Sequence, residues 1–182
     1  MNSIKEKLLF PIIYLFKMGA TIPHMNYYLF IDDKGNSFNG NQKIIFEYML
    51  QKYPMRKYVW AFKDKKQIIA FKEKYPQCHA VKYNSIRLCF YLQKSRYWIF
   101  NFVTPNYFKI SKYTFYLQTS DDLNIIDEDK DKLDYLFTKD EESKNKLIEE
   151  YKIKEKKIII SDYPINEQGN VNWEEIDKIL CQ

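Results

Sequence analysis

The sequence predicts an α/β protein with a mostly parallel sheet that is flanked by helices. Short apolar segments rich in aromatic and β-branched residues alternate with segments whose apolar residues recur at helical spacing. A helix length or a loop separates each apolar segment from the next, which is the pattern of parallel strands covered on both faces. Apolar residues make up 46% of the 182 residues and charged residues 29%, so a packed core is expected and wholesale disorder is excluded.

The expected strands are short apolar runs bounded by polar or turn-forming residues. In chain order they are Asn26–Ile31, Lys57–Lys63, Ala80–Tyr83, Tyr97–Phe102, Tyr113–Thr119, Asp134–Phe137 and Lys157–Ser161. Aromatic residues are frequent in Asn26–Ile31, Lys57–Lys63 and Tyr97–Phe102, whereas the last run contains three consecutive isoleucines. Of the 182 residues, 32 are Phe, Tyr or Trp, and most of these rings are expected in the core.

The expected helices lie between these strands and are located by apolar spacing and N-terminal caps. They are expected to begin at Asn39, at about Lys65, at Ser85, at Thr138 and at Asn172. Capping boxes predict three of these starts, formed by Asn39 with Gln42, Thr138 with Glu141 and Asn172 with Glu175. The acidic run Asp127–Asp131 is interpreted as a solvated connection.

Residues 1–25 are expected to form an amphipathic N-terminal arm, and residues 26–182 one domain. Ser3 and Glu6 form a capping box before a nearly continuous apolar run, Leu8–Phe16, which lysines flank. This run is shorter than the ~20 residues that span a bilayer, and no small-residue cleavage pattern follows it. The arm is therefore expected either to lie on an anionic inner membrane face or to dock on the domain as a core helix.

Scarce glycine, cysteine and histidine exclude several classes of site. The four glycines have no spacing that would form a Walker loop or a dinucleotide-binding loop. Three cysteines without a CxxC pair argue against a disulfide framework and a structural zinc site, and favour a reducing compartment. Cys78 and His79 are interpreted as a loop thiol beside a surface imidazole. No metal ion or cofactor is expected.

Charge is distributed unevenly along the chain. Residues 1–113 carry 19 Lys and Arg against 6 Asp and Glu, for a net charge of +13, whereas residues 114–182 carry 10 against 18, for −8. The basic part is expected to attract an anionic polymer or an acidic membrane surface. The alternative is that it pairs with the acidic part of the same chain. Lysine outnumbers arginine 26 to 3, which argues against nucleic acid as the partner.

Several segments together resemble the CDP-glycerol glycerophosphotransferase family of teichoic-acid primases and polymerases, in order and spacing over about residues 26–167. The segments that carry the resemblance are Tyr28-Leu29-Phe30, Ser37-Phe38-Asn39-Gly40-Asn41, Ile45–Leu50, Tyr58–Lys63, Ser95–Asn101, Pro105-Asn106-Tyr107-Phe108, Tyr116-Leu117-Gln118-Thr119, Asp134–Phe137 and Asp162–Asn166. The resemblance implies a Rossmann-like lobe of the GT-B N-terminal type, which faces the acceptor and the membrane. It also implies a second lobe that binds CDP-glycerol.

The resemblance leaves enzymatic activity open. In the family, the strand that matches Tyr116–Thr119 leads into a Trp-His-Gly turn whose histidine is the expected general base, but this chain has Ser120, Asp121 and Asp122 there. Asp121 is the candidate catalytic carboxylate. The adjacent carboxylate would repel a pyrophosphate. The family's donor lobe would have to follow residue 182, so transfer by this chain alone is not expected, because a GT-B site is assembled between two lobes.

Two functions from different classes follow. In the first, the chain is a degenerate or split glycerophosphotransferase lobe, peripheral at the inner face of the membrane, which binds an anionic acceptor through Asn39, Lys63, Arg96, Asn101 and Gln118. A separate chain would supply the donor lobe. In the second, it is a non-catalytic module that pairs with another protein through aromatic anchors. A third and weaker option, single-strand nucleic-acid binding by stacking, lacks an aromatic platform motif.

Overall fold

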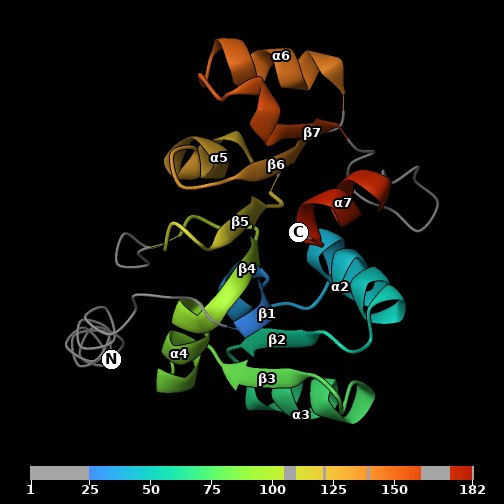
Figure 1. Ribbon diagram of the computed structural model, residues 1–182. Coiled ribbons are helices and arrows are strands. Elements are labelled where there is room, and N and C mark those ends of the chain that lie inside the picture. The colour runs from blue at the N-terminus through green and yellow to red at the C-terminus, as the bar shows by residue number, and fades with distance from the viewer. Residues whose placement is uncertain (1–24, 105–109, 121, 139, 161–172, 182) are drawn as a thin grey trace, which may run out of the picture.

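The computed structural model describes residues 25–104, 110–120, 122–138, 140–160 and 173–181. They form one seven-stranded sheet in the order β3-β2-β1-β4-β5-β6-β7, in which every neighbouring pair is parallel (Figure 1). The strands are β1 (Met25–Ile31), β2 (Lys57–Phe62), β3 (His79–Lys82), β4 (Ser95–Phe100), β5 (Phe115–Gln118), β6 (Tyr135–Thr138) and β7 (Ile158–Ile160). The predicted parallel α/β class is confirmed.

Helices cover both faces of this sheet, and buried side chains divide between the faces. The helices are α2 (Gly40–Lys52), α3 (Lys65–Lys74), α4 (Ile86–Lys94), α5 (Leu123–Asp129), α6 (Glu141–Glu149) and α7 (Trp173–Leu180), with short 3₁₀ turns η1 (Asp33–Gly35) and η2 (Glu155–Lys157). Along β1, Tyr28 and Phe30 enter the core shared with α2, α3 and α7, whereas Leu29 and Ile31 enter the core shared with α4, α5 and α6. This alternation follows from the period of two along a strand.

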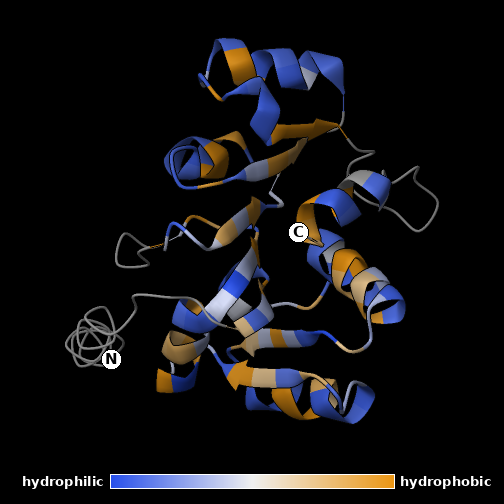
Figure 2. Ribbon diagram, in the orientation of Figure 1, coloured by the Kyte–Doolittle hydropathy of each residue, from blue (hydrophilic) through white to orange (hydrophobic). Residues whose placement is uncertain are grey.

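The aromatic residues of the first four predicted strands are mostly core, as expected. Trp60 and Trp98 are almost completely buried, one on each face of the sheet. Phe30 stacks on Trp60 with ring centroids 5.3 Å apart, and Phe46 meets Trp60 edge-on at 5.7 Å. Figure 2 shows β7 as mainly apolar and α6 as mainly hydrophilic. Burial of these rings supplies the main stabilisation of the sheet.

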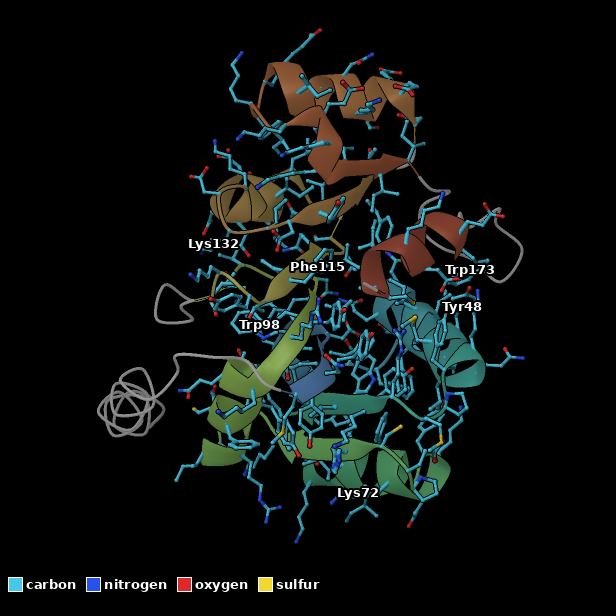
Figure 3. All side chains as sticks on the ribbon, viewed as in Figure 1. Tyr48, Lys72, Trp98, Phe115, Lys132 and Trp173 are labelled. Carbon is cyan, nitrogen blue, oxygen red and sulfur yellow. The ribbon has the colours of Figure 1, made fainter. Side chains whose placement is uncertain are left out.

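Helix α7 is held against α2 by stacking and by one shared carboxylate. Trp173 stacks on Tyr48 with ring centroids 3.9 Å apart, and Figure 3 shows these two side chains side by side. Asp177 accepts hydrogen bonds from the hydroxyls of Tyr48 at 2.8 Å and Tyr53 at 3.2 Å, and it forms an ion pair with Lys52. These bonds fix the end of the chain on the face that also carries α2.

The prediction for the acidic run was wrong. Residues 123–129 form α5, and Asp129 is fully buried instead of solvated. Its carboxylate accepts from the Thr104 N–H at 2.9 Å, the Thr104 hydroxyl at 2.8 Å, the Tyr116 hydroxyl at 2.8 Å and Lys132 Nζ at 2.8 Å. Burial, together with the Asp129 charge, raises the pKa of Tyr116 well above its usual value, so the phenol remains a donor.

A second correction concerns the start of α6. The N-cap is Asp140, whose carboxylate accepts from the Ser143 N–H at 2.7 Å, and the predicted cap Thr138 is the last residue of β6. Residues 1–24 of the predicted N-terminal arm and the predicted cap Asn172 lie outside the described residues, and Met25, assigned to the arm, begins β1. No helix in the described part of the chain is both long and apolar enough to cross a membrane.

The Asp129 cluster yields a stability prediction. Asp129→Asn is expected to lower the free energy of unfolding by about 2–3 kcal/mol, because it removes the charge that four donors share in the core. Asp127→Asn in the same helix is the control, since Asp127 pairs with Lys130 on the surface, and it is expected to cost less than about 0.5 kcal/mol. Urea unfolding measures both values. Equal losses would contradict the structural role given to Asp129.

Candidate functional site at the crossover between β1 and β4

The order in which the chain adds strands to the sheet reverses between β1 and β4. From β1 the chain continues to β2 and β3 on one side, and it then returns to β4 on the other side. In open parallel sheets the loops that follow the two strands at such a point diverge, and ligands bind beyond the carboxyl ends of the strands. Here the segments at that point are Asp32–Asn39 after β1 and the residues from Asn101 after β4.

Asp32 connects these two segments. Its side chain is buried, and its carboxylate accepts from the Ser37 hydroxyl at 2.7 Å, the Asn39 N–H at 3.0 Å and Asn101 Nδ2 at 2.6 Å. The Asn101 Oδ1 accepts in turn from the Asp33 N–H at 2.8 Å. The side chains of Asp32 and Asn101 thus connect the ends of β1 and β4. Both oxygens of the Asp32 carboxylate, and both the oxygen and the nitrogen of the Asn101 amide, already form hydrogen bonds. Asp32 is therefore a positioning residue in this arrangement.

The end of β5 is fixed by an internal amide. Gln118 is fully buried, and its Oε1 accepts from the N–H groups of Thr119 at 3.0 Å and Ser120 at 3.1 Å. Its Nε2 donates to the Phe102 carbonyl at 3.3 Å and the Tyr116 hydroxyl at 2.9 Å. Gln118 therefore fixes the turn after β5 through hydrogen bonds to its backbone, and its amide is not available to a ligand.

Helix α2 begins at the same edge, but the predicted capping box between Asn39 and Gln42 is wrong. Asn39 is the N-cap, yet its side chain makes no capping bond, and the Asn39 N–H that Gln42 would have bound is bound by Asp32. Asn41 Nδ2 instead connects the helix to the Thr119 carbonyl at 3.3 Å. Gln42 is buried, and among the described residues its Nε2 has no hydrogen-bond partner. The first turn of α2 thus carries an unsatisfied donor.

The loop after β1 is seated on β2 by Gly35. The Gly35 carbonyl accepts from the Lys63 N–H at 2.7 Å, and the Gly35 N–H donates to the Asp32 carbonyl at 2.7 Å. Gly35 has a φ of +86°, and a Cβ there would lie 3.0 Å from the Tyr83 Cβ, 3.1 Å from Lys63 N and 3.2 Å from Ala61 O. Only glycine fits this position without displacing the loop.

The structure brings together four of the five residues predicted to bind the acceptor. Asn39, Lys63, Asn101 and Gln118 all lie at the carboxyl ends of their strands or at the start of α2. Arg96 does not join them, because it is the second residue of β4 and so lies toward the opposite, amino edge of the sheet. The candidate catalytic residue Asp121 lies outside the described residues.

The rim of this edge carries charges of both signs. Asp33 and Asp122 are exposed, as are Lys34, Lys63 and Lys82. Lys63 Nζ lies 5.7 Å from the centroid of the Tyr83 ring, so a cation–π contact holds it near the β1 loop. Within the described parts of the chain, no group of three His, Cys, Asp or Glu side chains could hold a metal ion.

Asp32, Ser37 and Gln42 belong to this site and were missed as site residues in the sequence. The signal for Asp32 was present, because an acidic pair follows the first apolar strand directly. In a parallel sheet such a residue lies at the edge where the loops meet. The role of Gln42 had no such signal, because its lack of a partner depends on which residue binds the Asn39 N–H.

Comparison with known proteins bears on the family and the fold. The sequence matches the family described as CDP-Glycerol:Poly(glycerophosphate) glycerophosphotransferase over residues 14–176. No curated protein matches the sequence. Among solved structures, a variant of the wall teichoic acid polymerase TagF superposes with a TM-score of 0.68 at 21% identity, over 88% of this chain and 44% of that one.

A second TagF variant gives a TM-score of 0.65 at 22% identity over 80% of this chain and 40% of that one. A further TagF structure gives a TM-score of 0.67 at 21% identity. The present chain therefore spans less than half the length of the TagF chains that it matches. At this identity the likeness shows the fold, and the Rossmann-like, GT-B-type lobe expected from the sequence is confirmed.

Gly35 yields a prediction for the loop. Gly35→Ala is expected to lower the free energy of unfolding by about 2 kcal/mol or more, for two reasons. Alanine is strained at a positive φ, and its Cβ would lie too close to neighbouring backbone atoms. Gly40→Ala is the control: its φ is also positive, at +59°, but nothing lies within 4 Å of its Cβ position, so about 1 kcal/mol is expected. Thermal and urea unfolding compare the two. A larger loss for Gly40→Ala would contradict the close packing of the loop.

Gln42 yields a prediction of opposite sign. Gln42→Met keeps the length of the side chain and removes the unpaired amide, so the free energy of unfolding is expected to rise by about 1 kcal/mol. Gln118→Met is the matched control, because the Gln118 amide is fully hydrogen-bonded, and it is expected to destabilise by about 2 kcal/mol or more. If Gln42→Met destabilises the protein as much as the control does, the Gln42 amide has a partner in solution.

Proposed function

This chain belongs to the CDP-glycerol:poly(glycerophosphate) glycerophosphotransferase family, and on that premise we propose that it is the acceptor-side lobe of such an enzyme. The observation that supports this most is the Asp32–Asn101 link, which orders the loops at the crossover of a parallel sheet. In the proposal, a polyol phosphate chain binds at this edge. The lobe positions the acceptor and does not complete the transfer by itself.

The exposed groups at the edge suit a ligand that carries hydroxyls and phosphates. The Asn39 side-chain amide is exposed and makes no capping bond, so it is available to a hydroxyl or to a phosphate oxygen. The Lys63 ammonium is exposed at the carboxyl end of β2 and supplies a positive charge. The rim also contains carboxylates, so it is expected to bind a polyol phosphate through a few specific contacts and not as a uniformly basic surface.

The described residues of this edge offer no evident general base. The Asp32 carboxylate already accepts three hydrogen bonds, and the described histidine, His79, begins β3 at the opposite edge of the sheet. Asp121 remains the candidate base of the proposal. A donor nucleotide would be bound by a second lobe, which a longer form of the protein or a separate chain would supply. Only then would the acceptor hydroxyl face an activated phosphate.

The proposal places the protein at the cytoplasmic face of a membrane, where a lipid-linked acceptor would be presented. The apolar run Leu8–Phe16 with its flanking lysines and the +13 net charge of residues 1–113 support a peripheral attachment to anionic lipid.

Acceptor binding tests the proposal. Titration of the chain with a short oligomer of glycerol phosphate, followed by isothermal calorimetry at low salt, is expected to show saturable binding. The double variant Asn39→Ala with Lys63→Gln is expected to weaken it about tenfold, since two contacts of roughly 0.5–1 kcal/mol each are lost. The control is Lys146→Gln, an exposed lysine on α6.

Several outcomes would contradict the proposal. If the oligomer does not bind, or if Lys146→Gln weakens binding as much as the double variant, the edge at β1 and β4 is not an acceptor site. If the purified chain transfers glycerol phosphate from CDP-glycerol to the oligomer without any second protein, the lobe is not limited to positioning. Transfer is measured as release of CMP.

A further inference from the structure

A second concave region lies at the other end of the molecule, beside the edge strand β3. It is a cavity of about 320 Å³ between α3 and α4, lined by residues of these helices and by the chain from Cys78 to Val81. The amino end of β3 faces away from the crossover, because all strands of the sheet run in the same direction. The cavity is therefore separate from the proposed acceptor site, and nothing in that proposal uses it.

Two cations from different helices border this cavity without a counter-charge. Lys72 extends from α3 and Arg87 from α4, and both are exposed. Neither forms an ion pair with any described residue, and no acidic side chain lines the cavity. Figure 3 shows Lys72 at the outer surface of the β3 end of the sheet. Two unpaired cations on one small cavity favour an anion there.

The charge of Lys72 also acts on His79, which lines the cavity. His79, whose ring lines it, has a pKa lowered from the usual value, first by partial burial and then by the charges of Lys57 and Lys72. The neutral imidazole is therefore favoured at neutral pH. An anion bound beside it would offset the positive field and raise the pKa of His79 again.

The inner wall of the cavity is aromatic. Tyr91 packs against His79 with ring centroids 5.9 Å apart and meets Tyr27 edge-on at 5.2 Å, so its ring is held in place by two neighbours. Phe90 also lines the cavity and is 36% exposed. Aromatic rings fixed in this way provide a flat apolar surface against which another flat group can pack.

The edge strand adds a backbone donor. The Tyr83 N–H donates to the Phe62 carbonyl at 2.7 Å, so Tyr83 faces β2. Since successive residues of a strand alternate in the direction of their N–H and C=O groups, those of Ala80 point away from β2, toward the side where the cavity lies. A backbone donor, a lysine and an arginine thus converge from three elements.

We propose that this cavity binds a small organic anion with a flat aromatic body, whose phosphate or carboxylate lies between Lys72 and Arg87 and whose ring packs on Tyr91 and Phe90. The volume is at the lower end of the roughly 300–1,000 Å³ that is usual for small-molecule sites, so the ligand is of single-ring size. The paired cations would hold the anionic group, with Arg87 able to bind two of its oxygens at once.

Phenyl phosphate is a suitable probe, with phenyl carboxylate (benzoate) and inorganic phosphate as comparisons. The chain has two histidines, so the imidazole signals are resolved by NMR after labelling and assigned with His79→Asn. Phenyl phosphate is expected to shift the His79 signal saturably and to raise its pKa. The double variant Lys72→Gln with Arg87→Gln is expected to weaken this binding tenfold or more.

The control variant is Lys82→Gln, which removes an exposed lysine at the far end of the same strand and is expected to change the affinity less than twofold. Unfolding curves of all variants show whether they remain folded, and the substituted side chains are on the surface.

The relative affinities of the two aromatic probes identify the anionic group. An affinity for benzoate that equals or exceeds the affinity for phenyl phosphate would assign a carboxylate ligand, and a lower affinity for benzoate would assign a phosphate ligand. The absence of a saturable shift with either probe, or retained affinity in the double variant, would overturn the proposal. Equal affinity for inorganic phosphate would overturn the aromatic part of it.

Discussion

The hydrogen bonds to the Asp32 carboxylate are the constraint on which the candidate site depends. This single side chain binds its own loop through Ser37, the start of α2 through the Asn39 N–H, and the end of β4 through Asn101. Because β1 and β4 lie on either side of the crossover, the loops that follow them would otherwise diverge. A buried carboxylate with three donors keeps them in one arrangement, and the Gly35 turn holds that arrangement against β2.

This arrangement has an energetic consequence within α2. In a regular capping box the Asn39 N–H would bond to the side chain three residues later. Asp32 takes that bond, and the buried amide nitrogen of Gln42 is left without a partner in the part of the chain that the structure describes. A buried polar group without a partner destabilises the fold, and such exceptions are typical of functional sites. The geometry of the crossover is thus maintained at the expense of a better-satisfied helix start.

The fold was predictable from the sequence because aromatic and β-branched residues concentrate in the buried strands, and burial decides where strands form. Helix starts were less predictable, because a cap depends on which of several nearby donors and acceptors meet in three dimensions. Thr138 has the spacing of a cap but continues β6, and Asp140 takes its place. Asp129 resembles a solvated acid in sequence, and only the approach of Thr104 and Tyr116 makes its burial favourable. Family resemblance and strand position were enough to place Asn101 and Lys63 at the crossover edge, whereas Arg96 lies toward the amino edge of the sheet.

The sheet order also converts the uneven charge of the sequence into an uneven charge in space. Strands β3, β2, β1 and β4 come from the basic part of the chain, and β5, β6 and β7 come from the acidic part, so the two parts occupy opposite ends of the sheet. Lys52 with Asp177 is an ion pair that joins them across α2 and α7, but most described ion pairs stay within one part.

The basic part is thus not neutralised as a whole by the acidic part. Its unpaired cations instead remain at the β3 end, where Lys72 and Arg87 border the cavity, while the crossover itself carries a rim of mixed sign. In the two proposals made above, the crossover and the β3 cavity are therefore separate regions of the lobe, and each would bind its own anionic ligand.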